Sequence, residues 1–261
     1  MLFRSGMCNN MNPKQLGKDF EQFASGYTIT SDVSGQDFSH AVVTWIVTFK
    51  LLIESGVFSD DWEGCPSLVH PDLPPLGPLN RARFSAWMSC AYTYHIYKDA
   101  MYRVPGSLGS GQLITFLFNT FVACMINLLF VKEMEKNFIA LDFRCFGDDQ
   151  LTNFSKATAQ QAAAIGIDIP RQLSAFHARF GYLLTAADKS PTLRIINFTA
   201  AEFCGRRYLK LRRKDPVMAL VAPRMAKTIQ FSKKGQFIAN FPDQLLSFLG
   251  ELSYHSKGTF E

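Results

Sequence analysis

The sequence of 261 residues lacks the cysteine patterns of a zinc site or of a disulfide framework. Its six cysteines are scattered, with no Cys-x2-Cys pair and no Cys/His cluster at zinc-ligand spacing. The five histidines are equally dispersed and indicate no metal site. We interpret the cysteines as reduced thiols in a reducing compartment.

The N-terminus lacks the apolar stretch of a secretory signal peptide, because Met1–Arg4 is followed by glycine and polar residues. One long apolar run is present at Leu113–Val131, and by length it is a candidate membrane span. This run also carries Thr115, Asn119, Thr120 and Asn127. We therefore predict a buried core helix with one polar edge, and no transmembrane segment.

A strong excess of charge is absent as well. The formal net charge is +5, from 27 basic and 22 acidic residues, which permits a nucleic-acid partner without requiring one. With 48% hydrophobic and 19% charged residues, the composition excludes wholesale disorder. The length allows one large domain or two small ones.

Periodicity and turn signals predict a mixed fold in which helices pack on one antiparallel sheet. This is an α+β layout of the split βαβ kind. The expected elements, in chain order, are a strand at Tyr27–Val33, a helix at Ala41–Ser55, a strand or helix at Phe84–Tyr97, the apolar helix, strands at Phe143–Phe146 and Gln150–Asn153, helices at Lys156–Gly166 and Pro170–Arg179, and strands at Tyr182–Leu184, Arg194–Phe198 and Phe203–Leu209.

Two places supply paired aspartates at a strand end or in a turn. Asp32 and Asp37 follow the first predicted strand, and Asp148 and Asp149 follow Gly147 in a predicted hairpin. Converging carboxylates suit phosphoryl transfer, in which two magnesium ions about 3.5–4 Å apart clamp the attacking and leaving oxygens. Each motif alone also has an ordinary interpretation, as a hairpin turn or as a solvated strand end or helix cap.

A polar face marks the start of the apolar helix. Thr115 and Asn119 are four residues apart and share one face, and Ser110 stands at the helix entrance. Helix capping and a polar stripe would explain these residues without any ligand. Polar groups on an apolar helix are costly unless they have a partner, and a ribose hydroxyl would be such a partner.

Taken in order, these motifs resemble the palm motifs of RNA-dependent RNA polymerases of positive-strand RNA viruses, especially the picornavirus-like group. Motif A matches Asp32–Asp37, motif B matches Ser110–Asn119 and motif C matches Phe146–Asp149. Motif D resembles Phe180–Ser190, and motif E resembles Phe203–Tyr208. Five motifs in the family's order make the resemblance specific.

The resemblance implies template-directed addition of ribonucleotides to an RNA 3′ end, with Mg²⁺ or Mn²⁺ as cofactor. Asp32 and Asp148 would hold the metal ions with Asp149 in support, and Lys189 would protonate pyrophosphate. For Lys189, an exposed turn lysine is the ordinary alternative.

The same resemblance assigns residues to the nucleotide and to the RNA. Those implied in ribose and nucleotide recognition are Asp37, Ser110, Gly111, Thr115 and Asn119. Those implied in primer or RNA contact are Phe203, Arg206 and Arg207, although the arginines could equally be surface charge.

The implied architecture is a right-hand polymerase palm, an RRM-like antiparallel sheet packed on helices, with partial fingers and the start of a thumb. The implied division is 1–26 as a remnant of the fingers, 27–56 as palm with motif A, 57–105 as a fingers-type insertion, 106–210 as palm with motifs B to E, and 211–261 as the start of the thumb.

Three departures from the family pattern stand out. Phe146 replaces a tyrosine, and Gly205 stands where picornavirus-like enzymes often carry lysine. Only 31 residues precede Asp32, which is short for a fingers region. We therefore expect a fragment of a longer polymerase or half of a split one.

The expected partners are an RNA template with its primer or nascent strand, ribonucleoside triphosphates, and missing fingers or thumb segments or other replication proteins. The expected place is the host cytoplasm, at membrane-associated replication complexes. A catalytically incomplete palm fragment, an RNA-binding module, a membrane protein and a reverse transcriptase remain as alternatives. Asp37, Ser110 and Asn119 argue against the last, since reverse transcriptases typically put a bulky side chain where the 2′-hydroxyl would lie.

Overall fold

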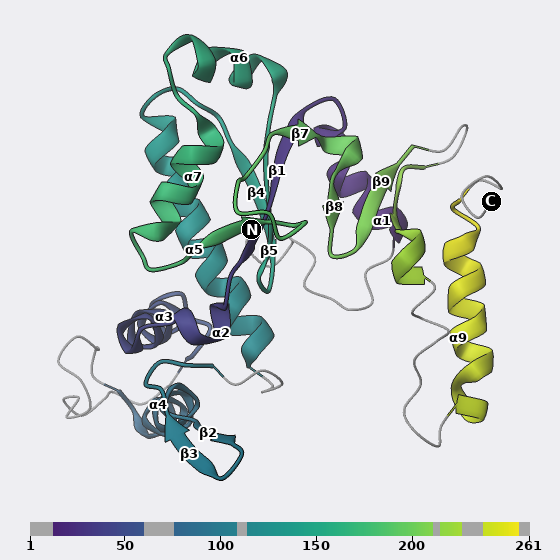
Figure 1. Ribbon diagram of the computed structural model, residues 1–261. Helices are drawn as coiled ribbons and strands as arrows, with labels where there is room; N and C mark the ends of the chain where they lie inside the picture. The colour runs from purple at the N-terminus through teal and green to yellow at the C-terminus, as the bar shows by residue number, and fades with distance from the viewer. Residues whose placement is uncertain (1–12, 60–75, 109–113, 211–214, 226–236, 256–261) are drawn as a thin grey trace.

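The fold is α+β, as predicted: helices pack against an antiparallel sheet in this computed structural model (Figure 1). The structure describes residues 13–59, 76–108, 114–210, 215–225 and 237–255. The predicted site residues Ser110 and Gly111 lie outside these ranges, and of Asp37 only the backbone is described.

The main sheet has five strands, with β1 (Tyr27–Val33) at its centre. The order is β4 (Asp142–Phe146), β5 (Asp149–Phe154), β1 and β6 (Leu184–Ala186), and β7 (Ile196–Asn197) also pairs with β1. All pairings are antiparallel. The predicted strand Tyr27–Val33 has the bounds that the structure gives it.

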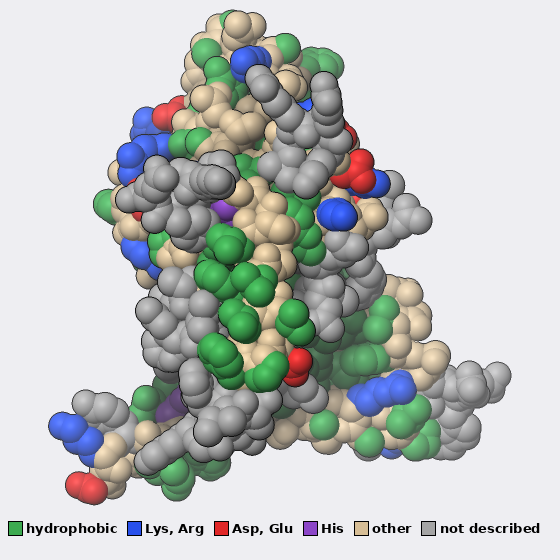
Figure 2. All heavy atoms as spheres, turned by 90° about the vertical axis from the view of Figure 1, so that its right-hand side faces the viewer, with side chains coloured by type: hydrophobic (Ala, Val, Ile, Leu, Met, Phe, Trp, Pro, Cys, Tyr) green, Lys and Arg blue, Asp and Glu red, His purple; other side chains and the backbone are tan. Residues whose placement is uncertain are grey.

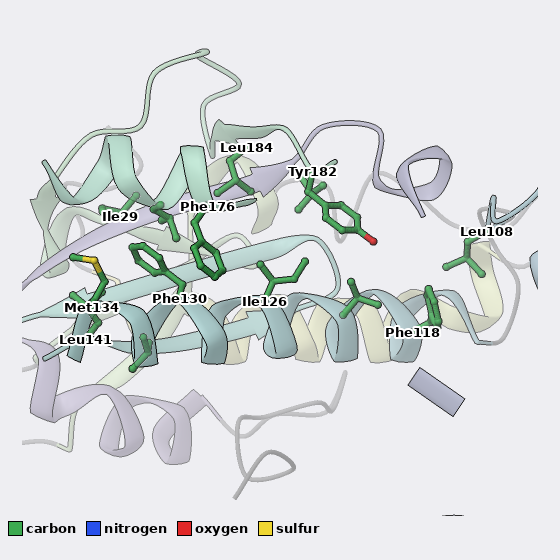
Figure 3. Close-up of a cluster of buried hydrophobic side chains, with 14 of the residues drawn as sticks. Ile29, Leu108, Phe118, Ile126, Phe130, Met134, Leu141, Phe176, Tyr182 and Leu184 are labelled. Atoms are coloured by element: carbon green, nitrogen blue, oxygen red, sulfur yellow. The ribbon is translucent and has the colours of Figure 1, made fainter. Parts of the chain in front are cut away.

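The long helix α5 (Thr115–Glu135) provides much of the core under this sheet. It buries a row of apolar side chains spaced four residues apart, a spacing that places them on one face. The row is Phe118, Val122, Ile126, Phe130 and Met134. Phe176 of α7 (Ile169–Ala178) packs against Phe130 with ring centroids 5.5 Å apart, and Ile29 lies in the same cluster (Figure 3).

Within the described ranges, α5 is the helix that is long and apolar enough to cross a membrane. More than half of its apolar stretch is buried inside the protein. The predicted core helix with a polar edge is therefore what the structure contains: Asn119, Thr120 and Asn127 are buried along it.

The helices α3 (Val42–Glu54) and α4 (Pro78–Ala91) extend the core beside the start of α5. Trp45 of α3 stacks on Phe118, with ring centroids 3.9 Å apart, and Trp87 of α4 donates a hydrogen bond to the Trp45 carbonyl. The bounds are α1 Pro13–Phe20, η2 Glu21–Phe23, α2 Gln36–Ser39, α3 Val42–Glu54, α4 Pro78–Ala91, α6 Lys156–Ala164 and η3 Phe198–Ala200.

A second, three-stranded sheet lies beside the first, in the order β10 (Val217–Leu220), β9 (Arg206–Leu209), β8 (Glu202–Phe203). The C-terminal helix α9 (Phe237–Leu252) stands on the far side of it in Figure 1. The Glu251 carboxylate accepts a hydrogen bond from the backbone N–H of Leu220. Figure 2 faces this side and shows hydrophobic side chains gathered on its surface; Leu245, Leu246 and Leu249 of α9 are exposed.

Several sequence predictions need correction or refinement. The single strand predicted at Phe203–Leu209 is broken by a tight turn, because Cys204 and Gly205 adopt positive φ angles of 54° and 71°. The stretch Phe84–Tyr97 is a helix and then a strand, β2 (Tyr94–Tyr97), which pairs with β3 (Ala100–Arg103).

The other corrections concern short strands. The strand predicted at Tyr182–Leu184 lies instead at Leu184–Ala186. These residues pair with β1, with Leu184 opposite Val33. The strand β10 was not predicted at all.

Candidate active site

The hairpin between β4 and β5 presents two aspartates at its turn. Gly147 has φ +64°, a conformation that glycine adopts without the steric cost of a Cβ atom. Its N–H donates a 2.7 Å hydrogen bond to the hydroxyl of Thr120 on α5. Asp148 follows and is exposed, while Asp149 opens β5 and is half-buried. The turn is thus fixed to the helix directly behind it.

Asp32 lies next to this turn because β1 and β5 are paired. Asp32 and Asp149 are opposite each other in the register of the two strands. Asp32 is 6% exposed, and its carboxylate lies within hydrogen-bonding range of Asp148. The structure therefore brings Asp32 next to Asp148 and Asp149, which follow it by more than a hundred residues in the sequence.

Lys189 completes the cluster from a third segment. It occupies a turn after β6, with φ +64° and with its N–H bonded to the carbonyl of Ala186 at 2.7 Å. Its ammonium group forms an ion pair with Oδ2 of Asp32, while the lysine side chain as a whole stays exposed. Of the predicted catalytic residues, all four lie at this one place.

The electrostatics of the cluster show a shortage of positive charge. Burial raises the pKa of Asp32. The hydrogen bond from Lys189 lowers that pKa, and the negative charge of Asp148 raises it further. Burial, Asp148 and Asp32 together raise the pKa of Asp149 to about 6. The hydrogen bond to Asp32 raises the pKa of Lys189, so this lysine stays protonated at neutral pH. Carboxylates held this close disfavour one another's charge.

A buried polar stripe on α5 supports the hairpin from behind. Thr120 accepts the Gly147 N–H, and Asn127 donates a 2.7 Å hydrogen bond to Oε1 of Gln150. Gln150 is the residue after Asp149, so both ends of the turn are tied to one helix. Thr120 and Asn127 were visible in the sequence as polar residues in an apolar run, but their partners were not.

Of the residues predicted to recognise ribose, Thr115 and Asn119 are described with their side chains. Thr115 begins α5 and is half-buried, whereas Asn119 is 5% exposed. Oδ1 of Asn119 lies 2.8 Å from Nε2 of His40, and its backbone carbonyl accepts a bond from Gln36. These contacts join α5 to the segment that follows β1.

The predicted RNA-contact residues differ in their surroundings. The ring of Phe203 is 6% exposed and packs on Phe20, and its contact with RNA stays a prediction. Arg206 forms a 2.8 Å ion pair with Glu251 and donates to the carbonyl of Met218. Arg207 is exposed and pairs with Glu202 at 2.9 Å. Contact of either arginine with RNA remains a prediction.

Sequence patterns missed Arg224, which lies in a helical segment after β10. Its side chain lies over Gly205, where an added Cβ would meet it at 3.0–3.3 Å. Its charge lowers the pKa of Asp149, so the guanidinium is near the carboxylate cluster. Arg224 is exposed, and it has no ion pair within the part of the chain that the structure describes. An isolated arginine 19 residues beyond Gly205 gave no signal in the sequence.

No three His, Cys, Asp or Glu side chains among the described residues form a ready-made ligand group for a metal ion. The donors that the site offers are carboxylate oxygens, chiefly of Asp32 and Asp148. Carboxylates in small number are typical of magnesium sites that are completed by water and substrate phosphates.

Comparison with known proteins gives one family match and several relatives. The family model described as viral RNA-dependent RNA polymerase matches residues 14–261. The genome polyprotein of Human rhinovirus C (strain C15) is 30% identical over 119 residues, which cover 44% of this chain and 5% of the polyprotein. The genome polyprotein of Deformed wing virus is 29% identical over 125 residues, which cover 44% of this chain and 4% of that polyprotein. The genome polyprotein of Poliovirus type 3 is 24% identical over 183 residues, which cover 64% of this chain and 8% of that polyprotein.

The matched segments span less than a tenth of the length of these polyproteins. The family match, in contrast, covers nearly the whole chain and includes all four residues of the carboxylate–lysine cluster.

Proposed function

The chain belongs to the family of viral RNA-dependent RNA polymerases, and we propose that it carries out template-directed addition of ribonucleotides to RNA 3′ ends. The observation that carries this proposal is the meeting of Asp32, Asp148, Asp149 and Lys189 at one end of the paired strands β1 and β5. These groups are the ones that phosphoryl transfer to a nucleoside triphosphate requires, since that chemistry is mostly positioning and charge neutralisation.

Divalent metal ions are general cofactors of this family, and the cluster fits them. The pKa of Asp149, raised to about 6 by burial and two neighbouring carboxylates, indicates a site whose negative charge is under-compensated. We assign Asp32 and Asp148 as the residues that hold Mg²⁺ or Mn²⁺, with Asp149 in support. When bound, such ions stabilise the attacking 3′-oxygen and the leaving pyrophosphate.

The chain's own residues have three further tasks in this reaction. The Gly147 turn, held by Thr120, keeps Asp148 in position. Lys189 is protonated at neutral pH, and we assign it as the acid that gives a proton to the leaving pyrophosphate. Asn119 faces the nucleotide sugar in this proposal, together with Asp37, Ser110, Gly111 and Thr115.

The domain assignment follows the same proposal. Residues 27–56 and 106–210 form the palm, since the main sheet and α5 come from them. Residues 57–105 form a fingers-type insertion, and the β2–β3 hairpin projects from it (Figure 1). Residues 1–26 belong to the fingers, and 211–261 begin a thumb, with α9 joined to Arg206 through Glu251.

The partners in this proposal are an RNA template, a primer or nascent strand, ribonucleoside triphosphates, and further polymerase segments or replication proteins. The relatives are genome polyproteins of RNA viruses. We therefore place the reaction in the host cytoplasm, at membrane-associated replication complexes.

The test is primer extension by the polymerase that contains this chain, with Asp148→Ala and Asp215→Ala compared. Both variants remove one exposed aspartate, but Asp215 pairs with Lys18 and lies outside the carboxylate cluster. We expect Asp148→Ala to abolish nucleotide addition, because it removes a metal-holding carboxylate. The Asp215→Ala variant should stay active. Parallel reactions with NTPs and dNTPs separate an RNA polymerase from a reverse transcriptase.

Two results would count against the proposal. Retained activity in Asp148→Ala would remove the cluster from the mechanism. Incorporation of dNTPs as efficiently as NTPs would favour the reverse transcriptase alternative.

A further inference from the structure

His40 is a buried histidine that joins three parts of the candidate active site and that no sequence motif singled out. It is 3% exposed and directly follows α2. Its Nδ1 lies 2.8 Å from Oη of Tyr182, and its Nε2 lies 2.8 Å from Oδ1 of Asn119. The imidazole thus bridges the segments that resemble motifs A, B and D.

The position of His40 is fixed by packing on several sides. The edge of its ring meets Phe118 with centroids 4.8 Å apart and an interplanar angle of 83°. Its backbone carbonyl lies against Gly106, where φ is +86° and an added Cβ would collide with that carbonyl. Trp45 donates a 2.9 Å hydrogen bond to the carbonyl of Gly106 and so fixes the glycine as well. The imidazole therefore has little freedom to move away from its two partners.

The two hydrogen bonds of the His40 imidazole have the same donor-to-acceptor direction, from Tyr182 through the imidazole to Asn119. Burial raises the pKa of Tyr182 to about 12, so its hydroxyl is protonated at neutral pH and can donate to Nδ1. The Thr44 side chain forms a hydrogen bond with the same phenol. Because an amide oxygen can only accept, the hydrogen of the imidazole must be on Nε2, where it is donated to Asn119. In Figure 3 the Tyr182 hydroxyl lies on the side of the cluster nearest Phe118, the neighbour of Asn119.

This direction has a consequence for Asn119. With Oδ1 held by His40, the amide cannot exchange its oxygen and nitrogen without losing that bond. The amide nitrogen is therefore the end that Asn119 offers as a donor. A ribose 2′-hydroxyl can accept from it, and a deoxyribose cannot. Sites built to bond a hydroxyl discriminate against the analogue that lacks it, because the hydrogen bond to that hydroxyl cannot form.

We propose that His40 is a positioning residue for sugar selection, which holds the Asn119 amide with its nitrogen toward the 2′-hydroxyl of the incoming nucleotide. This inference rests on the proposed function and assigns a selective role to a residue outside the predicted motifs. The imidazole itself does not touch the substrate; it acts through Asn119.

A purely structural role is the competing explanation, and the two differ in what they change. Loss of a packing residue alone would lower stability and reduce NTP and dNTP use together. Loss of a positioning residue would reduce the preference for NTP over dNTP. The decisive quantity is therefore the ratio of kcat/KM for a matched NTP and dNTP pair.

The variants are His40→Leu, His40→Gln and Tyr182→Phe, with His177→Leu as the matched control. His177 is also a buried histidine, and its hydrogen bond goes to the Leu173 carbonyl within its own helix α7. We expect His40→Leu to lower the NTP/dNTP ratio at least about tenfold, the size expected for one lost hydrogen bond. Glutamine can still donate to Asn119, so His40→Gln should retain most of the ratio.

The outcomes separate this inference from the proposed function. If the unaltered polymerase adds no ribonucleotide, the proposed function fails. Suppose instead that the unaltered polymerase adds ribonucleotides and that Asp148→Ala abolishes the reaction. A folded His40→Leu variant that keeps the full NTP/dNTP ratio would then overturn the role of His40 and leave the proposed function intact. A loss of the ratio in His177→Leu equal to that in His40→Leu would likewise overturn it.

A second readout needs neither activity nor a variant that folds. Nitrogen NMR of the unaltered chain, labelled in histidine, reports which imidazole nitrogen carries hydrogen. We expect His40 as the neutral Nε2–H form, bonded to Asn119. The Nδ1–H form would contradict the proposed direction of the bonds.

Discussion

Lys189 forms an ion pair with Asp32, and this contact joins the turn after β6 to the end of the central strand β1. The lysine side chain is 70% exposed, whereas that of Asp32 is 8% exposed. An exposed ammonium group thus neutralises a buried carboxylate that belongs to a crowded acidic cluster. Asp32 is also one of the residues that we assign to a metal ion, so Lys189 and a bound metal would compete for its carboxylate. Lys189 would then be available to the substrate phosphates.

The first prediction concerns Lys189→Met, which removes the ammonium group and keeps the length of the side chain. We expect the rate of nucleotide addition to fall about a hundredfold or more, the usual contribution of a positioned general acid. Since the competing cation is gone, Mn²⁺ should bind more tightly to the variant. Single-turnover kinetics measure the first effect, and electron paramagnetic resonance of added Mn²⁺ measures the second.

Lys210→Met is the matched control, because Lys210 is another exposed lysine in an ion pair, with Glu21, away from the cluster. It should change neither the rate nor Mn²⁺ affinity. Equal effects of the two substitutions would show that Lys189 acts only through net charge.

The second prediction uses the raised pKa of Asp149, about 6 against an ordinary value of 3.8. The folded state holds this proton more tightly than the unfolded chain, so the contribution to stability is present at low pH. It is lost as the pH rises from about 4 through about 6. We expect Asp149→Asn to remove this loss and to raise the melting temperature at pH 7 without metal. A gain of about 2–4 °C for each kcal/mol of relieved repulsion is expected for a chain of this size.

The measurement is thermal unfolding between pH 4 and pH 8 in the presence of a chelator. Glu202→Gln serves as the control, since Glu202 is an exposed acid paired with Arg207. The explanation fails if Asp149→Asn and the unaltered chain show the same dependence on pH.

The third prediction concerns Thr120, whose hydroxyl accepts the N–H of Gly147. Valine has the same shape but no acceptor, so Thr120→Val leaves a buried N–H without a partner. We expect the free energy of unfolding to fall by about 1–3 kcal/mol. Nucleotide addition should fall as well, because the turn that carries Asp148 loses its attachment to α5.

Thr120→Ser keeps the hydroxyl and should behave like the unaltered chain in both urea unfolding and primer extension. A valine variant as stable as the serine variant would show that the bond to Gly147 contributes little.

Local sequence signals predicted much of this fold and the residues at the centre of the candidate site. The strand Tyr27–Val33, the hairpin around Gly147 and the helix α5 all follow from periodicity and turn chemistry, which act over a few residues. The meeting of Asp32 with Asp149 could be expected only through the resemblance, since strand pairing joins segments over a hundred residues apart.

The features that were missed depend on contacts between distant segments. His40 and Arg224 are single residues without a repeating pattern, and their roles come from Asn119 and Gly205, which lie far along the chain. The break at Cys204 was missed because β-type residues on both sides resembled one continuous strand. Side-chain partners of this kind are set by packing, which no local signal encodes.

The fourth prediction ranks the three arginines around the β8–β9 turn by their contribution to RNA binding. Arg206 is tied to Glu251, and Arg207 to Glu202, so both guanidinium groups already have a carboxylate partner. Arg224 is exposed beside Gly205 and close to the carboxylate cluster. A phosphate of the RNA strand that ends at the cluster would be within its reach. Arg224 would then supply the positive charge that the family often carries at the position of Gly205.

We therefore expect Arg224→Gln to weaken RNA binding and to reduce the slope of log affinity against log salt by about 1, as for one lost phosphate contact. Arg207→Gln is the matched exposed control and should change the slope less. Arg206→Gln should instead lower stability by about 3 kcal/mol, because it leaves Glu251 without its partly buried partner. Fluorescence anisotropy over a series of salt concentrations measures the slopes. A larger change of slope for Arg207→Gln than for Arg224→Gln would assign the phosphate contact to the residue that the sequence motif implied.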